Sequence, residues 1–181
     1  MKPKSTFSAT EENLVALLGA CAVFLALIEH MIPKPLPFLR IGLANLPVLI
    51  ALSVLRPRKL LLVVALKVLG QGLISGTLFS YVFLFSAAGS VSSALVMLAV
   101  SRLPDRAVSL VGISIAGGLA STAAQLALAL LMVFGRGALF IAPVFLAVSL
   151  VTATALGLIA RAFCARSRWY AQIAGPGGRW R

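Results

Sequence analysis

Acidic side chains are the scarcest feature of this sequence. Its 181 residues include only four Asp and Glu, against 16 Lys and Arg. The single aspartate, Asp105, stands far along the chain from the three glutamates. Magnesium–diphosphate chemistry normally uses clustered carboxylates, and the sequence has no such cluster. We therefore expect a protein that is not an enzyme of that kind.

Histidine and cysteine are also scarce, and one phosphate-binding motif is missing. A lone histidine, His30, cannot make a His-based zinc site, and the only cysteines are Cys21 and Cys164. The sequence has no Gly-x-x-x-x-Gly-Lys-Ser/Thr loop, so it does not energise transport by its own nucleotide hydrolysis. We expect no metal, no cofactor and no disulfide.

Apolar residues dominate what is present. They make up 61% of the chain, and the mean hydropathy is +1.07, whereas a soluble domain is about half apolar. Six apolar runs are visible, at 13–32, 43–55, 59–76, 78–101, 107–134 and 138–163. We predict an all-α polytopic membrane protein with six transmembrane helices. Its expected parts are a cytoplasmic N-terminal segment (1–12), the transmembrane domain (13–163) and a basic cytoplasmic tail (164–181).

The basic residues between the runs predict the orientation. With a cytoplasmic N-terminus, 12 Lys and Arg lie inside and only Lys34, Arg40 and Arg136 lie outside, as the positive-inside rule requires. Both termini are therefore expected in the cytoplasm, with both cysteines near that side, where thiols stay reduced. In the tail, Arg166, Arg168 and Trp169 suit an anionic inner leaflet better than nucleic acid.

The first run follows a plausible helix start at Thr10 to Asn13, lacks a cleavage site, and is expected to stay in the membrane. Small residues recur along it, including Ala16 and Ala20. Small stripes let helices approach closely. This stripe is either internal packing or a docking face for a partner protein.

Glu29 is the only acid in any apolar run, and a proline-rich stretch, 33–42, follows it before Asn45. The second run has 13 residues and spans about 20 Å as a helix, which is short for a crossing. Either part of 33–42 enters the membrane region beside a binding site, or a tilted helix follows an interfacial loop.

Lys67 lies inside the third run, where a charged side chain costs about 2.5–3.5 kcal/mol. Gln71 and Ser75 follow at i+4 and i+8, so one helix face carries all three and should point into the bundle. Lys67 either contacts Glu29 structurally, although helical rise puts Glu29 farther out, or contacts a polar or anionic ligand.

Gln125 occupies the outer half of the fifth run, amid small residues that are typical of a closely packed central helix. It serves either as interhelical glue or as a ligand contact. The polar residues buried at such cost are the candidates for a ligand site. They are Glu29, Asn45, Lys67, Gln71 and Gln125.

The six-run layout and three stretches, 41–45, 67–72 and 73–80, resemble the bacterial Gx transporter family, which often carries the label heptaprenyl diphosphate synthase component I. The similarity covers about residues 14–163. That family in turn resembles the S components of energy-coupling-factor transporters, which are six-helix membrane proteins.

The resemblance implies a subunit of the bacterial inner membrane that binds a small molecule from outside. Separate ATPase subunits and a transmembrane coupling subunit, which would dock on Ala16 and Ala20, would energise uptake. Two alternatives stay open. One is a non-catalytic membrane subunit in heptaprenyl diphosphate or quinone synthesis, and the other is an accessory of flavin-linked extracytosolic electron transfer.

Overall fold

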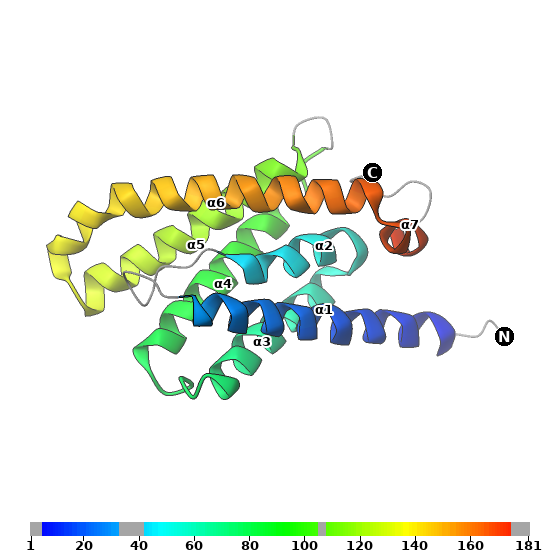
Figure 1. Ribbon diagram of the computed structural model, residues 1–181, viewed down its shortest axis with the longest axis horizontal. Helices are drawn as coiled ribbons and strands as arrows, with labels where there is room; N and C mark the ends of the chain where they lie inside the picture. The colour runs from blue at the N-terminus through cyan, green and yellow to red at the C-terminus, as the bar shows by residue number, and fades with distance from the viewer. Residues whose placement is uncertain (1–4, 33–41, 105–107, 175–181) are drawn as a thin grey trace.

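The computed structural model describes residues 5–32, 42–104 and 108–174, and within these ranges the chain is helical with no strand (Figure 1). The predicted all-α class is therefore confirmed. The elements are α1 (Ser5–Met31), η1 (Leu43–Asn45), α2 (Leu46–Val54), α3 (Pro57–Ile74), α4 (Tyr81–Val100), α5 (Leu110–Met132), η2 (Gly135–Gly137), α6 (Ala138–Arg166) and α7 (Arg168–Ala174).

Within the described ranges, four helical stretches are long and apolar enough to cross a bilayer. They are Glu11–Met31, Tyr81–Val100, Leu110–Met132 and Ala138–Arg166. This makes the chain a membrane protein. Helix α3 carries three basic residues in 18, and η1 with α2 forms only a short apolar helix. The count of six crossings therefore stays a prediction.

Helix α1 begins earlier than its sequence suggested. It starts at Ser5, so the predicted start at Thr10 to Asn13 is wrong. No glycine or proline occurs between Ser5 and Leu18, so a helix can continue from the membrane into water without a break. The Glu11 carboxylate then lies 2.8 Å from Lys59 Nζ and 3.9 Å from Arg56 Nε, which ties α1 to the start of α3.

Helix α5 is the central helix of the bundle, as predicted, because it packs against both α4 and α6 (Figure 1). Glycines allow this close approach. A Cβ atom at Gly117 would lie 2.2 Å from the Met97 side chain, and one at Gly157 would lie 2.8 Å from Val111 Cα. On the other side of the molecule, α1 packs on α3 in the same way, with Gly70 against Val23.

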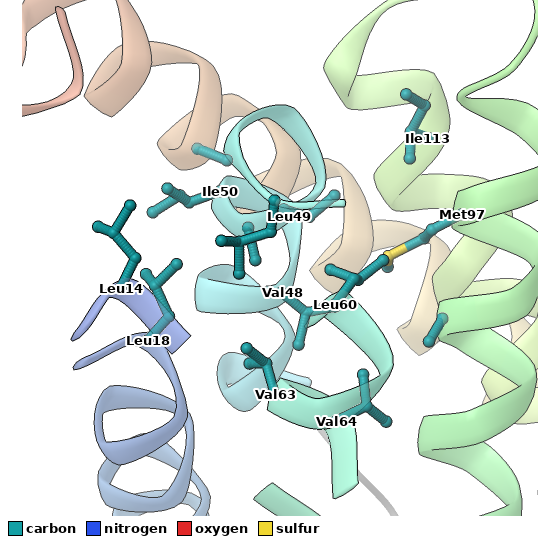
Figure 2. Close-up of a cluster of buried hydrophobic side chains, with 14 of the residues drawn as sticks. Leu14, Leu18, Val48, Leu49, Ile50, Leu60, Val63, Val64, Met97 and Ile113 are labelled. Atoms are coloured by element: carbon teal, nitrogen blue, oxygen red, sulfur yellow. The ribbon is translucent and has the colours of Figure 1, made fainter. Parts of the chain in front are cut away.

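The largest apolar cluster surrounds α2. Five consecutive residues of this helix, from Pro47 to Ala51, are buried, and Figure 2 shows Leu14 and Leu18 of α1 pointing toward Ile50. A helix that is largely covered by its neighbours can be short and uniformly apolar. The short second run is therefore a core helix packed among the others.

A second cluster forms near the opposite ends of α4, α5 and α6. Its buried members are Phe85, Leu126, Ala129, Ala138 and Phe145. Along each of these three helices, one cluster lies toward one end and the other cluster toward the other end. The middle turns of α4, α5 and α6 therefore lie between the two apolar clusters.

The segment after α6 folds back as α7, which the sequence did not indicate. Tyr170 of α7 is fully buried in the cluster around α2, and the Trp169 ring lies 6.4 Å from that of Phe163. The first part of the predicted tail is thus packed against the bundle. The start of α1 and the junction of α6 with α7 lie at the same end of the molecule (Figure 1).

Candidate functional site

A polar cavity of roughly 30 Å³ occupies the middle turns between the two apolar clusters. On α5 its lining extends from Ser114 to Gln125, about 16 Å along the helix. Residues from α1, η1, α3, α4, α5 and α6 all contribute to its wall. Its polar lining consists of Glu29, Asn45, Lys67, Ser90, Ser114, Ser121, Thr122, Gln125, Ser149 and Thr152.

Charged residues gather at one side of the cavity, around the turn from Gly42 to Asn45. Gly42 adopts the left-handed conformation, with φ +86°, which favours glycine. Its backbone N–H donates to Glu29 Oε1 at 3.1 Å, and Lys67 Nζ donates to Asn45 Oδ1 at 2.5 Å. The turn therefore joins Glu29 to Lys67 across the difference in depth that helical rise predicts.

Burial makes this charged group expensive to maintain. Glu29 is 5% exposed and Lys67 is 3% exposed. A charge buried in a membrane helix needs a partner or several hydrogen bonds. The face with Lys67, Gln71 and Ser75 was predicted to point into the bundle. This is confirmed for Lys67 and Gln71, which are buried, whereas Ser75 is half-buried at the end of α3.

Amide and hydroxyl groups line the other side. Gln125 Nε2 donates to Ser121 Oγ at 3.1 Å, one turn earlier on the same helix. Its side chain lies directly against α4, since a Cβ atom at Gly89 would lie 2.5 Å from Nε2. Ser114 donates to the Ala153 carbonyl of α6 at 2.7 Å. Ser114 thus joins α5 to α6. The hydrogen bond of Gln125 stays within α5, and the Gln125 side chain forms part of the cavity wall.

Four of the five candidate ligand residues line this one cavity, namely Glu29, Asn45, Lys67 and Gln125. Gln71 does not belong to the lining. It lies one turn farther along α3 and accepts a hydrogen bond from Ser86 of α4 at 3.4 Å. Gln71 supports the arrangement of α3 against α4 rather than the wall of the cavity.

The hydroxyl groups of the wall are the residues that sequence reasoning missed. Serine and threonine are common packing residues in membrane helices, so Ser90, Ser114 and Thr152, taken individually, do not indicate a binding site. The spacing of the α5 residues with Gln125 could have predicted a shared polar face. Ser114, Gly118, Ser121 and Gln125 recur every three or four residues and so share a face of α5.

The small residues of α1 divide into two faces. Ala22 and Ala26 are buried and belong to the internal packing, while Ala16 and Ala20 are exposed on the outer face of the helix. A docking role for Ala16 and Ala20 stays a prediction. The predicted entry of 33–42 into the membrane region lies outside the described residues, apart from Gly42.

Side chains that commonly bind metal ions are few and scattered in the described ranges. They contain no group of three or more His, Cys, Asp and Glu side chains arranged to hold an ion. Cys21 and Cys164 are free thiols, one exposed and one buried. What the cavity offers is one carboxylate, one ammonium group, amides and hydroxyls, which suits recognition of a polar molecule.

Comparison with known proteins identifies the family. The model of the family described as heptaprenyl diphosphate synthase component I matches residues 18–163, well over half of the chain. The match contains every residue of the polar cavity. Neither curated proteins nor solved structures give a significant match. The chain therefore belongs to the heptaprenyl diphosphate synthase component I family.

Proposed function

We propose that this protein is a membrane-embedded substrate-binding subunit, similar to the S components of energy-coupling-factor transporters. It captures a small molecule from outside, and separate ATPase subunits with a transmembrane coupling subunit energise uptake. In this proposal the protein crosses a bacterial inner membrane six times, has both termini in the cytoplasm, and catalyses no reaction itself.

The polar cavity is the observation that carries this proposal. Intramembrane ionisable residues are rare, and they typically mark substrate or ion pathways. Here Glu29 and Lys67 line the same cavity as Gln125 and several hydroxyl groups. The hydroxyl groups come from the middle turns of α4, α5 and α6, three helices that are apolar enough to span a bilayer. Packing alone would be served by apolar side chains at lower cost.

The charges of the cavity favour a particular class of ligand. One carboxylate and one ammonium group give its wall no net charge, and an additional unpaired charge on the ligand would be costly at this depth. The ligand we propose is a compact neutral or zwitterionic molecule with several hydrogen-bonding groups. A cavity of roughly 30 Å³ has room for about one water molecule, so binding requires the lining helices to separate.

A second candidate is favoured by the family description. A non-catalytic membrane subunit of a heptaprenyl diphosphate synthase is compatible with a chain that lacks clustered carboxylates. In that case the catalytic partner is a separate soluble protein docked at the basic end of the bundle, which carries Arg56 and Arg58 at the start of α3 and Arg166 and Arg168 at the junction of α6 with α7. This function gives the buried charges of the polar cavity no role, which is the reason for ranking it second.

The experiment that separates these functions is purification of the tagged protein from its native membrane in mild detergent, followed by mass spectrometry. Our proposal expects a coupling subunit, two ATPases and a small polar metabolite. Recovery of a prenyl synthase without ATPases would replace it with the second candidate.

Ala16→Trp and Ala20→Trp are expected to abolish recovery of the coupling subunit while leaving the bound metabolite in place. Both alanines are exposed on α1, so an indole there blocks a close helix contact without entering the core. Ala147→Trp, at an exposed alanine of α6, is the matched control. Equal recovery of the coupling subunit from all three variants would remove the docking face from the proposal.

Gln125→Met is expected to lower metabolite retention about fivefold to tenfold, because a hydrogen bond to a neutral group contributes about 1 kcal/mol. Methionine keeps the length of the side chain beside Gly89, so the thermal midpoint of the detergent-solubilised protein should change little. Metabolite bound per mole of protein, measured by mass spectrometry, checks this. Unchanged retention would make Gln125 a packing residue.

A further inference from the structure

A second cavity lies at the outside of the bundle, at the basic end. Its volume is roughly 320 Å³, about ten times that of the polar cavity. Four side chains of α1 form one wall, and residues of α2, Phe163 of α6 and Trp169 of α7 form the rest. We call it the α1–α7 groove. No polar atom contributes to its surface.

The α1 wall shows how the groove is oriented. Leu17, Cys21 and Leu25 recur every four residues, so they follow one face of the helix for about 12 Å along its axis. Leu17 is six residues beyond Glu11, which pairs with Lys59 at the start of α3. The groove therefore starts near the basic end and continues along α1 toward the middle of the protein.

Basic residues flank the groove at that end. Arg166 lies one helical turn beyond Phe163, and Arg168 adjoins Trp169. Both arginines are exposed. A tryptophan beside arginines is typical of the membrane–water interface, so this end of the groove lies at headgroup level when α1 and α6 span the bilayer.

We propose that the α1–α7 groove is a binding site for an anionic phospholipid of the surrounding leaflet. One acyl chain lies against Leu17, Cys21 and Leu25, and the phosphate lies between Arg166 and Arg168. The apolar lining accepts the chain and the arginines complement the charge of the headgroup. This site is separate from the polar cavity and does not rest on the function proposed for it.

The charge pattern favours a lipid over a protein helix as the occupant. An apolar protein helix that passed through the groove would have no charged group to pair with the two arginines at one end of the groove. A phospholipid has its single anionic group at one end and its apolar chains beside it. Each arginine near an anionic headgroup is expected to raise association about fivefold.

Trp169 provides the test, because it lines the groove. The chain has two tryptophans, and Trp180→Phe leaves Trp169 as the only one. The full-length variant is placed in phosphatidylcholine vesicles containing either dibromo-phosphatidylglycerol or dibromo-phosphatidylcholine as a minor component. Bromine on the acyl chain quenches a tryptophan that it contacts. We expect much stronger quenching by the anionic lipid at the same mole fraction.

Two variants locate the headgroup and the chain. Arg166→Gln with Arg168→Gln should lower the preference for the anionic lipid by about fivefold for each arginine removed, while Arg102→Gln, an exposed arginine after α4, should not change it. Cys21→Phe fills the groove and should weaken quenching by both brominated lipids. All of these substitutions are at exposed side chains, so folding is retained.

Three outcomes would overturn the proposal. Equal quenching by the two lipids would mean that the groove has no headgroup preference. Quenching that is insensitive to Cys21→Phe would mean that the chain lies elsewhere. Relief of quenching by a trace of farnesyl diphosphate, against a large excess of phosphatidylglycerol, would reassign the groove to an isoprenyl diphosphate.

Discussion

Lys67→Met is expected to destabilise the protein by about 3–5 kcal/mol, because it leaves the buried Glu29 carboxylate in the cavity without its compensating cation. Methionine is close to lysine in length, so packing changes little. The amide oxygen of Asn45 also loses the donor that lies 2.5 Å from it. Reversible unfolding in mixed micelles of dodecyl sulfate and a mild detergent measures the change.

Two further variants make this result specific. Adding Glu29→Gln to Lys67→Met removes the uncompensated charge and should restore most of the lost stability. Lys59→Met tests a lysine paired with Glu11 at the partly exposed end of α3, where solvent weakens an ion pair and a much smaller loss is expected. A Lys67→Met loss no larger than that of Lys59→Met would show that other groups compensate the Glu29 carboxylate.

The double variant also separates the two roles of Lys67. If the lysine only balances Glu29, the stable Lys67→Met/Glu29→Gln protein keeps its bound metabolite. If the lysine contacts the ligand, the same protein is stable but retains at least tenfold less metabolite than Glu29→Gln alone, as expected for loss of a charged hydrogen bond. Metabolite content of the purified double variant decides between these roles.

Gly157→Ala is expected to destabilise the protein by about 1–3 kcal/mol, although alanine is the better helix former. The new methyl group would lie 2.8 Å from Val111 Cα and 3.0 Å from Ser114 Cβ. A backbone atom of α5 cannot move without moving the helix. Separation of α5 from α6 would also stretch the hydrogen bond from Ser114 to Ala153 in the cavity wall.

Gly112→Ala is the matched control for this substitution. It lies on α5, where an added Cβ would have no neighbour closer than the Ser109 Oγ at 3.5 Å. Its backbone N–H keeps its bond to the Ser109 cap. This variant should be neutral or stabilised by up to about 1 kcal/mol, so the two alanines are expected to change the unfolding free energy in opposite directions. A neutral Gly157→Ala would mean that α6 has room to shift.

Much of the architecture followed from the sequence because it depends on local composition. Long apolar runs can bury their backbone polar groups only as helices in a membrane, so the helical class could be predicted. The cost of burial likewise singled out Glu29, Lys67 and Gln125 before any contact was known. These arguments need only the chain itself, since hydropathy acts residue by residue.

Other features depend on how the helices pack, and no local pattern contains them. The apolar run of the short helix α2 does not indicate how deeply the helix is buried, and only the packing of the other helices around it buries Pro47 to Ala51. Rise along two separate helices placed Glu29 and Lys67 at different depths, yet the turn from Gly42 to Asn45 connects them. The depth of a residue along α1 or α3 does not reveal that a separate turn lies between the two helices and connects their side chains.

The cavity wall shows the same division. Each buried charge was costly enough to stand out in the sequence, whereas a single serine costs little in a membrane helix and carries no such signal. Only the packing of α4, α5 and α6 through their glycines brought Ser90, Ser114 and Ser149 around one space. The sequence by itself therefore determined that a few costly polar side chains lie inside the bundle. The tertiary structure decided which side chains share the cavity, because convergence of weakly polar groups is a property of several helices together.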